Sequence, residues 1–155
     1  MGFTTPSLKG RALRLLSQRE HSRAELQRKL ARHVQEGEDL GAMLDDLTAK
    51  DFINEARVVE SVVHRRASRM GSARIRQELQ AKGIVGEVVQ EAVAQLQGSE
   101  LERAQDLWQR KFGEPPADLG GAARRMRVLL ARGFSGDAVR RVVPNLPSAY
   151  GRPSD

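Results

Sequence analysis

Arginine side chains are the groups in this sequence with the clearest capacity to bind another molecule. Arginine supplies all but five of the 26 basic residues. Its guanidinium group binds phosphate or carboxylate through two parallel hydrogen bonds. The formal net charge is +6, and the sequence pI is about 10.4. These properties predict a polyanion or an acidic protein groove as the partner.

The basic residues gather in three stretches that an acidic stretch interrupts. Residues 9–32 carry eight basic and two acidic side chains, and residues 57–76 carry six arginines and Glu60. Residues 124–141 carry six arginines and one aspartate, whereas residues 36–55 carry seven acidic side chains and Lys50. A folded chain with this pattern is expected to present a basic stripe. The residues predicted to bind the partner or DNA are Arg19, Arg23, Arg28, Arg65, Arg66, Arg69, Arg74, Arg76, Arg124, Arg125 and Arg127.

Patterns typical of enzymes and metal sites do not occur. The spacings of His21, His33 and His64 do not match the i, i+4 pair of a helical metal site. Cysteine is absent, which excludes thiolate catalysis and sulfur-ligated zinc. No glycine-rich loop leads into Lys-Ser or Lys-Thr, and no carboxylate pair is marked as buried. We therefore predict a protein that is not an enzyme and has neither a cofactor nor a metal.

These arginines must be positioned by helices, because apolar residues recur at helical spacing along most of the chain. No segment alternates as a strand does. Ser22 with Glu25, and Ser99 with Glu102, have the spacing of a capping box, which predicts a helix start at each serine.

Internal repetition organises the predicted helices. Glycine followed by an acidic residue recurs at spacings of 49 and 50 residues, at Gly37, Gly86 and Gly136. The apolar positions Leu30, Leu79 and Leu129 keep the same register. Gly83 and Gly133 each follow a basic residue and precede an apolar one, which predicts a left-handed glycine that ends a helix.

The fold class predicted from this repetition is all-α, with three tandem three-helix repeats that form an elongated, curved array. A longer loop is expected at Gly113–Pro116, and Gly120-Gly121 is expected not to continue a helix. The predicted parts are an N-terminal tail at 1–7, repeats at 8–50, 51–98 and 99–146, and a flexible tail at 147–155.

Aromatic residues are few, and Phe52, Trp108 and Phe134 occupy positions expected to lie in the core. Base stacking on single-stranded nucleic acid needs exposed aromatic rings. Any contact with nucleic acid is therefore predicted to involve phosphates. No secretion signal or membrane span is recognisable, so we expect a cytoplasmic protein.

Residues 8–34 also permit a helix-turn-helix interpretation, with Arg19–His21 as the turn and Ser22 opening a recognition helix. That alternative predicts a stand-alone DNA-binding regulator. The recurrence of the same helix pair elsewhere in the chain favours a repeated scaffold instead.

The order and spacing of several motifs resemble the RecX family, which regulates the RecA recombinase. The motifs are Ala12–Leu16, Arg19–Leu26 with Lys29-Leu30, Asp51–Arg57, and Gly71 with Arg74–Ile84. The chain departs from the family at Val58, where an aromatic residue is usual, and at His33-Val34, which replaces a glycine stop.

The resemblance implies a protein of tandem three-helix repeats that acts in DNA repair, recombination and the SOS response. Such a protein lies in the groove of the RecA filament on single-stranded DNA. There it typically restrains ATP hydrolysis, strand exchange and filament growth. The expected partners are therefore the RecA filament and the DNA phosphates within it, with no membrane partner and a monomeric chain.

Overall fold

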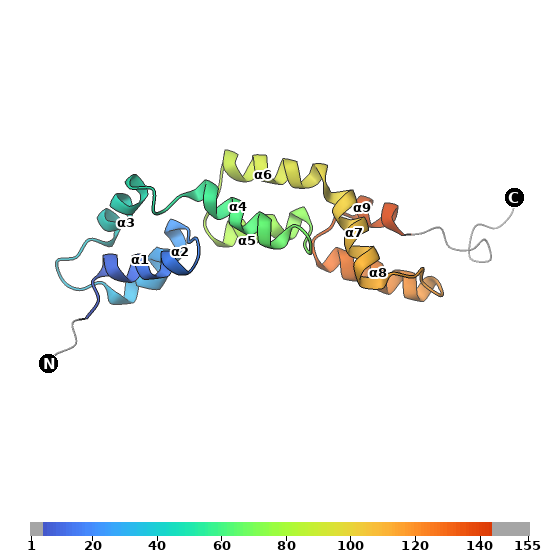
Figure 1. Ribbon diagram of the computed structural model, residues 1–155, viewed down its shortest axis with the longest axis horizontal. Helices are drawn as coiled ribbons and strands as arrows, with labels where there is room; N and C mark the ends of the chain where they lie inside the picture. The colour runs from blue at the N-terminus through green and yellow to red at the C-terminus, as the bar shows by residue number, and fades with distance from the viewer. Residues whose placement is uncertain (1–4, 144–155) are drawn as a thin grey trace, which may run out of the picture. The chain divides into compact units, whose positions relative to one another are not determined.

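The computed structural model describes residues 5–143, and these residues are helical with no strand. The α-helices are α1 (Leu8–Gln18), α2 (Arg23–Leu30), α3 (Leu40–Ala49), α4 (Glu55–Arg66), α5 (Ser72–Ala81), α6 (Glu87–Gly98), α7 (Glu100–Phe112), α8 (Leu119–Ala131) and α9 (Gly136–Val142) (Figure 1). A short 3₁₀ helix, η1 (Ala31–His33), extends α2. The predicted all-α class is confirmed. The predicted tail at 147–155 lies outside the described residues, as do the first four residues of the tail at 1–7.

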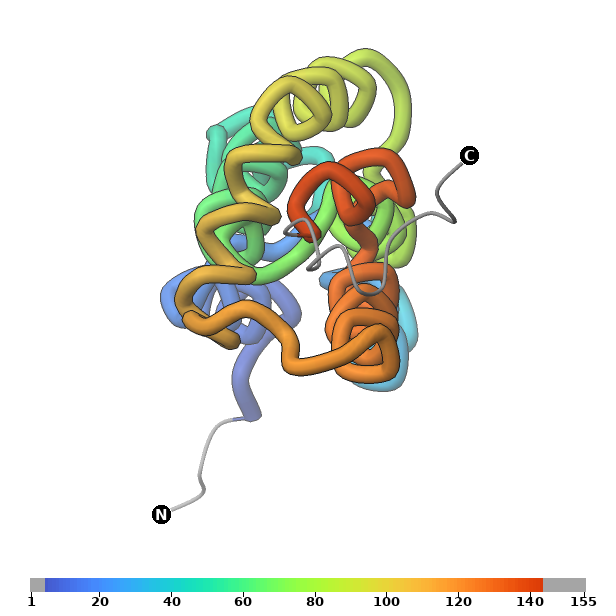
Figure 2. Tube along the Cα trace, turned by 90° about the vertical axis from the view of Figure 1, so that its right-hand side faces the viewer, coloured from blue at the N-terminus to red at the C-terminus, as the bar shows by residue number. Residues whose placement is uncertain are grey.

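The helices follow one another in three sets of three. In the first set, α1, α2 and α3 contact one another, and in the third set α7 and α8 both pack against α9 (Figure 2). None of the helices in residues 5–143 has both the length and the apolarity to cross a bilayer. The residue limits given above for each repeat stay predictions, as does the elongated, curved arrangement.

Two compact units divide the described chain, and the boundary between them falls within α4, α5 and α6. The first unit contains residues 5–62 and Leu79–Val89, and the second contains Val63–Glu78 and residues 90–143. The core of the first is formed by Leu8, Ala12, Leu26, Leu30, Leu44, Leu47 and Ile53. The core of the second is formed by Ala104, Leu107, Trp108, Leu129, Phe134 and Val139. The prediction of core positions for Trp108 and Phe134 is confirmed.

A helix begins after each of the two serines predicted to open one, Ser22 and Ser99, but only Ser22 forms the predicted capping box. Ser22 accepts from the backbone N–H of Glu25, and the Glu25 carboxylate accepts from the N–H of Ser22. The capping box predicted at Ser99 is wrong. Only Ser99 separates α6 from α7, and its backbone is not extended, so its hydroxyl donates back to the carbonyl of Leu96.

Two further predictions are corrected by local geometry. Phe52 is not in the core, since 47% of it is exposed. Asp51 has φ of 65°, and the turn it makes directs Ile53 inward while leaving the ring of Phe52 outside. Gly120 and Gly121 do continue a helix, because they lie in the first turn of α8, where Asp118 accepts from the N–H of Gly121. The predicted loop before α8 is present (Figure 2).

A glycine turn ends α5 and another ends α8, as predicted. Gly83 has φ of 75° and Gly133 has φ of 90°, which is the left-handed region. After each glycine, the next N–H reaches back five residues, from Ile84 to the Leu79 carbonyl and from Phe134 to the Leu129 carbonyl. These bonds satisfy carbonyl groups that a helix end leaves without partners.

Each glycine turn is held against the start of another helix. In the first unit, Ser22 donates to the Lys82 carbonyl at 2.6 Å. In the second unit, the N–H of Gly71 donates to the Arg132 carbonyl at 2.8 Å. Ser22 and Gly71 are equivalent in the repeat, so the same junction is made twice: the second helix of one repeat begins against the turn that ends the second helix of the next.

The junction at Gly71 predicts the effect of adding one methyl group. A Cβ on Gly71 would lie 2.2 Å from backbone atoms of Gly133 and Phe134, which cannot move without opening the turn. We expect Gly71→Ala to lower the free energy of unfolding by about 2 kcal/mol or more. Urea denaturation followed by circular dichroism measures this change.

Gly98→Ala is the matched control, because a Cβ there meets nothing within 4 Å. Alanine is the better helix former, so the free energy of unfolding of this variant should equal that of wild type or exceed it by up to about 1 kcal/mol. Equal stability of the two variants would contradict the close approach at Gly71.

Candidate partner-binding surface

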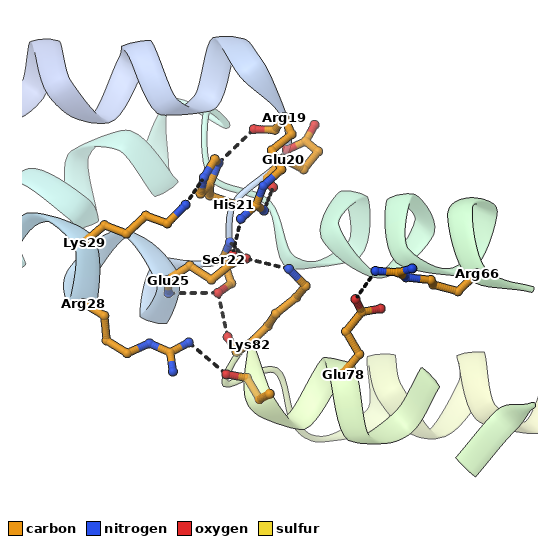
Figure 3. Close-up of polar contacts among 11 residues, drawn as sticks. Arg19, Glu20, His21, Ser22, Glu25, Arg28, Lys29, Arg66, Glu78 and Lys82 are labelled. Carbon is orange, nitrogen blue, oxygen red and sulfur yellow. Dashed lines mark hydrogen bonds and ion pairs between the residues drawn. The ribbon is translucent and has the colours of Figure 1, made fainter. Parts of the chain in front are cut away.

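A buried carboxylate organises the start of α2. Only 8% of the Glu25 side chain is exposed, and its two oxygens accept from Arg19 at 2.7 Å and from Lys82 at 3.2 Å. Figure 3 shows these three side chains pointing toward one another, with Lys82 coming from the end of α5. Arg28 also reaches this end of α5 and donates to the Ala81 carbonyl. Glu25 therefore holds the junction of the first unit by charge as well as by packing.

The surroundings of Glu25 favour its ionised form. Desolvation by burial opposes ionisation, but the hydrogen bonds from Arg19 and the Ser22 N–H, together with the charge of Lys82, outweigh it. The net effect lowers the pKa of Glu25 to about 2. A buried carboxylate with these partners is a structural anchor rather than a group poised to exchange protons near neutral pH.

His21 is buried beside this anchor. Its Nδ1 lies 3.0 Å from the Arg19 carbonyl and its Nε2 lies 3.0 Å from the Lys29 ammonium. Because an ammonium can only donate, Nε2 accepts and Nδ1–H donates, which defines a neutral ring. Desolvation, together with the charges of Arg19 and Lys29, lowers the pKa of His21. The histidine thus serves to position the turn between α1 and α2.

The acidic stretch neutralises part of the basic first repeat. Asp45 pairs with Arg23, and Asp46 pairs with both Lys9 and Lys50. Arg57 pairs with Asp51 and also with Glu20. Most of these pairs join distant parts of the sequence rather than residues one helical turn apart. Sequence spacing alone therefore does not reveal which arginines form ion pairs with acidic side chains.

The second unit has its own buried carboxylate. Glu100 is 5% exposed and accepts from the backbone N–H of Ser72 at 2.9 Å and from its hydroxyl at 3.1 Å, so a residue of α7 caps the start of α5. Beside it, Arg103 donates to the carbonyls of Ala67, Met70 and Leu96. Desolvation lowers the pKa of Arg103, and the charge of Glu100 partly offsets this effect. Arg103 is a structural cross-link.

Some of the arginines predicted to bind a partner are engaged within their own unit. Besides Arg19, Arg23 and Arg28, the Arg66 guanidinium pairs with Glu78 at 3.3 Å (Figure 3). The Arg125 guanidinium donates to the Glu114 carbonyl and lies over the rings of Trp108 and Phe112, 4.8 Å from the centre of the latter. These side chains are held in place, and partner binding would have to use the donors they leave free.

Other predicted arginines are exposed and make no ion pair within residues 5–143. They are Arg65, Arg69, Arg74, Arg76, Arg124 and Arg127. Of these, Arg69 makes one long hydrogen bond, to the Arg65 carbonyl at 3.5 Å. Arg66 and Arg74 line one groove of about 490 Å³ together with Met70 and Glu78. The structure thus brings two predicted residues together at one concave surface of the second unit.

The start of α2 is not open as a recognition helix would be. Ser22 and Glu25 contact the end of α5, and the backbone N–H groups of these two residues are already bonded within the capping box. Within the described residues, no group of three or more histidine or acidic side chains is placed to hold a metal ion.

Three family models match the chain in succession. They describe the first, second and third three-helix domains of RecX, and they match residues 9–38, 54–93 and 99–143. Regulatory protein RecX of Leptothrix cholodnii is 58% identical over 137 residues, which cover 88% of this chain and 87% of that protein. Regulatory protein RecX of Ralstonia nicotianae is 50% identical with 88% and 86% coverage. The prediction of tandem three-helix repeats is confirmed.

The fold is similar to a solved structure as well. The crystal structure of RecX from Lactobacillus salivarius superposes with a TM-score of 0.66 at 23% identity, covering 87% of this chain and 91% of that one. At this identity the likeness concerns the fold.

The depressed pKa of Glu25 predicts how stability depends on pH. A carboxylate with a folded pKa near 2 and an unfolded value of 4.5 contributes stability above pH 4.5 that is lost as the pH falls through 2. The difference in unfolding free energy between wild type and Glu25→Gln should therefore shrink by up to about 3 kcal/mol over that range. Urea denaturation at several pH values measures it.

Asp45→Asn is the control, because it removes an ion pair whose carboxylate is 73% exposed. Surface ion pairs contribute little to stability, so the free energy of unfolding of this variant should depend on pH in the same way as that of wild type. The anchor role of Glu25 would be contradicted if the unfolding free energy of Glu25→Gln had the same pH dependence as that of wild type.

Proposed function

Because the chain belongs to the RecX family of regulatory proteins, we propose that it regulates the RecA recombinase by binding the RecA filament on single-stranded DNA. Binding restrains ATP hydrolysis, strand exchange and filament growth. The chain itself hydrolyses nothing and uses no cofactor. It acts in the cytoplasm as a monomer.

The observation that carries this proposal is the match of all three RecX domains in order, with exposed arginines on the helices they contain. A filament groove offers DNA phosphates and acidic protein side chains, and a guanidinium binds both. The binding residues proposed are the eleven arginines named from the sequence. The exposed ones that make no ion pair are the strongest candidates, since binding breaks no internal contact.

The mechanism follows from what a binding protein can do. A ligand changes the conformation or assembly of its partner only through different affinities for the partner's states. Three similar domains in tandem can contact successive portions of a helical filament, and linked contacts raise the effective concentration of each. The chain therefore favours a filament state in which ATP turnover is slow.

The stand-alone helix-turn-helix regulator is the weaker alternative. A recognition helix contacts bases with residues near its N-terminus. In this chain the start of α2 is covered by the end of α5, through Ser22 and Lys82. Using α2 to read a groove would require that junction to open.

The proposal predicts an effect on recombinase turnover. Adding the protein to RecA that is hydrolysing ATP on single-stranded DNA should slow hydrolysis, and the protein alone should release no phosphate. Co-sedimentation with filaments, compared with bare single-stranded and duplex DNA, measures binding directly. Unchanged turnover at saturating protein, alongside tight binding to free duplex DNA, would favour the helix-turn-helix alternative.

The exposed arginines of the second unit predict a loss of filament binding on mutation. Replacing Arg65, Arg74 and Arg76 with Gln should leave the helical content unchanged, because exposed charges contribute little to stability. Filament affinity should fall at least about tenfold. If phosphates are the partner, the dependence of log K on log salt should also become shallower by about 0.7 for each lost contact.

The matched control removes three charges from elsewhere, at Lys50, Arg140 and Arg141, which pair with acids of their own helix. Both variants have the same net charge. Equal losses would mean that filament binding depends on overall charge and not on these arginines.

A further inference from the structure

A cleft lined by cations lies between α1 and the end of α2 in the first unit. Its volume is about 680 Å³, and Leu15 and Leu30 provide apolar parts of its lining. The charged and titratable side chains that line it are Arg11, Arg14, Arg28, Lys29, Arg32 and His33. No carboxylate belongs to its described lining.

The cations of this cleft differ from the others of the first unit. Arg19, Arg23 and Arg57 each bind a carboxylate, as do the lysines of the same unit at positions 9, 50 and 82. Within residues 5–143, neither Arg11 nor Arg14 makes an ion pair or a hydrogen bond through its side chain. Like charges held together without acids repel one another, so folding alone does not account for their position.

The helix dipole explains only part of the arrangement. Cations are favoured at the C-terminal end of a helix, which accounts for Arg28, Lys29 and Arg32 at the end of α2. Arg11 and Arg14 lie within α1, one helical turn apart, and neither lies in the last turn of its own helix. They face the same cleft from the opposite helix.

His33 reports the local electrostatic potential. Its Nε2 accepts a hydrogen bond from Arg32 Nε at 3.2 Å, which requires a nitrogen without a proton. Desolvation, followed by the charges of Arg11 and Arg32, lowers the pKa of His33. The charges of Arg11 and Arg32 thus add to desolvation in disfavouring the charged form of His33.

We propose that this cleft is a binding site for the phosphate backbone of single-stranded nucleic acid. Charge complementarity selects an anion with several charges. No Phe, Tyr or Trp side chain belongs to the described lining, so bases gain no large stacking platform and recognition is independent of sequence. A flexible single strand can follow a concave surface of this size, whereas duplex DNA is a stiff rod that bends only at a cost.

The site extends the proposed function without depending on it. Arg11, Arg14 and Arg32 are not among the arginines assigned to the filament, and the binding concerns nucleic acid alone. A test without recombinase therefore separates failure of this site from failure of filament regulation.

The test measures binding of a fluorescent oligothymidylate by anisotropy at several salt concentrations. The cleft variant replaces Arg11, Arg14 and Arg32 with Gln. Loss of three phosphate contacts should make the slope of log K against log salt shallower by about 2, which is an affinity loss of about 100-fold at 0.1 M salt. The control variant, with Gln at positions 50, 140 and 141, should lose less than about threefold.

Equal losses in the two variants would overturn the proposal, because binding would then reflect net charge alone. Duplex DNA of the same sequence and inorganic tripolyphosphate are the comparison probes. A cleft variant that loses tripolyphosphate or duplex binding but retains oligothymidylate binding would also overturn it. Circular dichroism establishes that both variants fold.

Histidine resonances give an independent readout. In the free protein the cleft variant should show a higher pKa for His33, since two neighbouring positive charges are gone. Oligothymidylate should raise the pKa of His33 in wild type, because a bound phosphate stabilises the imidazolium. An unchanged pKa at saturating oligothymidylate would place the strand elsewhere and overturn the site.

Discussion

The structure depends on the close approach of a helix-ending glycine turn to the start of another helix. At Gly133 an added Cβ would lie 2.5 Å from the Cβ of Arg74, and at Gly83 it would lie 2.7 Å from that of Ala24. A left-handed backbone without a side chain is the combination that permits such contact. Each turn also presents a carbonyl, of Lys82 or Arg132, to a donor at the neighbouring helix start. The same glycine turn, with its backbone carbonyl as acceptor, thus links successive repeats.

Charge reinforces the two junctions by different means. Glu25 gathers Arg19 and Lys82 in the first unit, whereas in the second unit Glu100 comes from α7 to bind Ser72. Burying a carboxylate is unfavourable unless hydrogen bonds or opposite charges compensate it, and each of these carboxylates has at least two such partner groups: Arg19 and Lys82 for Glu25, and the N–H and hydroxyl of Ser72 for Glu100. Losing the contact with one partner would leave a buried charge uncompensated. These acids therefore favour the arrangement in which each junction keeps its contacts.

The remaining charges divide into those that folding uses and those it leaves available. Asp45, Asp46 and Asp51 form ion pairs with basic side chains of the first unit. Within residues 5–143, Arg74 and Arg76 on α5, Arg124 and Arg127 on α8, and Arg11 and Arg14 in the cleft make no ion pair, so an external anion can bind them without breaking one. A regulator that acts only through binding energy needs such groups, held on helices that do not rearrange.

The sequence by itself determined the all-helical class, the repeat register, the glycine stops and the family, because helical periodicity and turn chemistry are local properties. Ser22 and Gly133 behave as their neighbours in sequence require. Only the tertiary structure decided which charges are free. Arg23 and Arg14 look alike in the sequence, yet one binds Asp45 and the other faces a cleft. Ion pairs join residues distant in sequence, and burial of Glu25 or exposure of Phe52 depends on elements that local spacing does not encode.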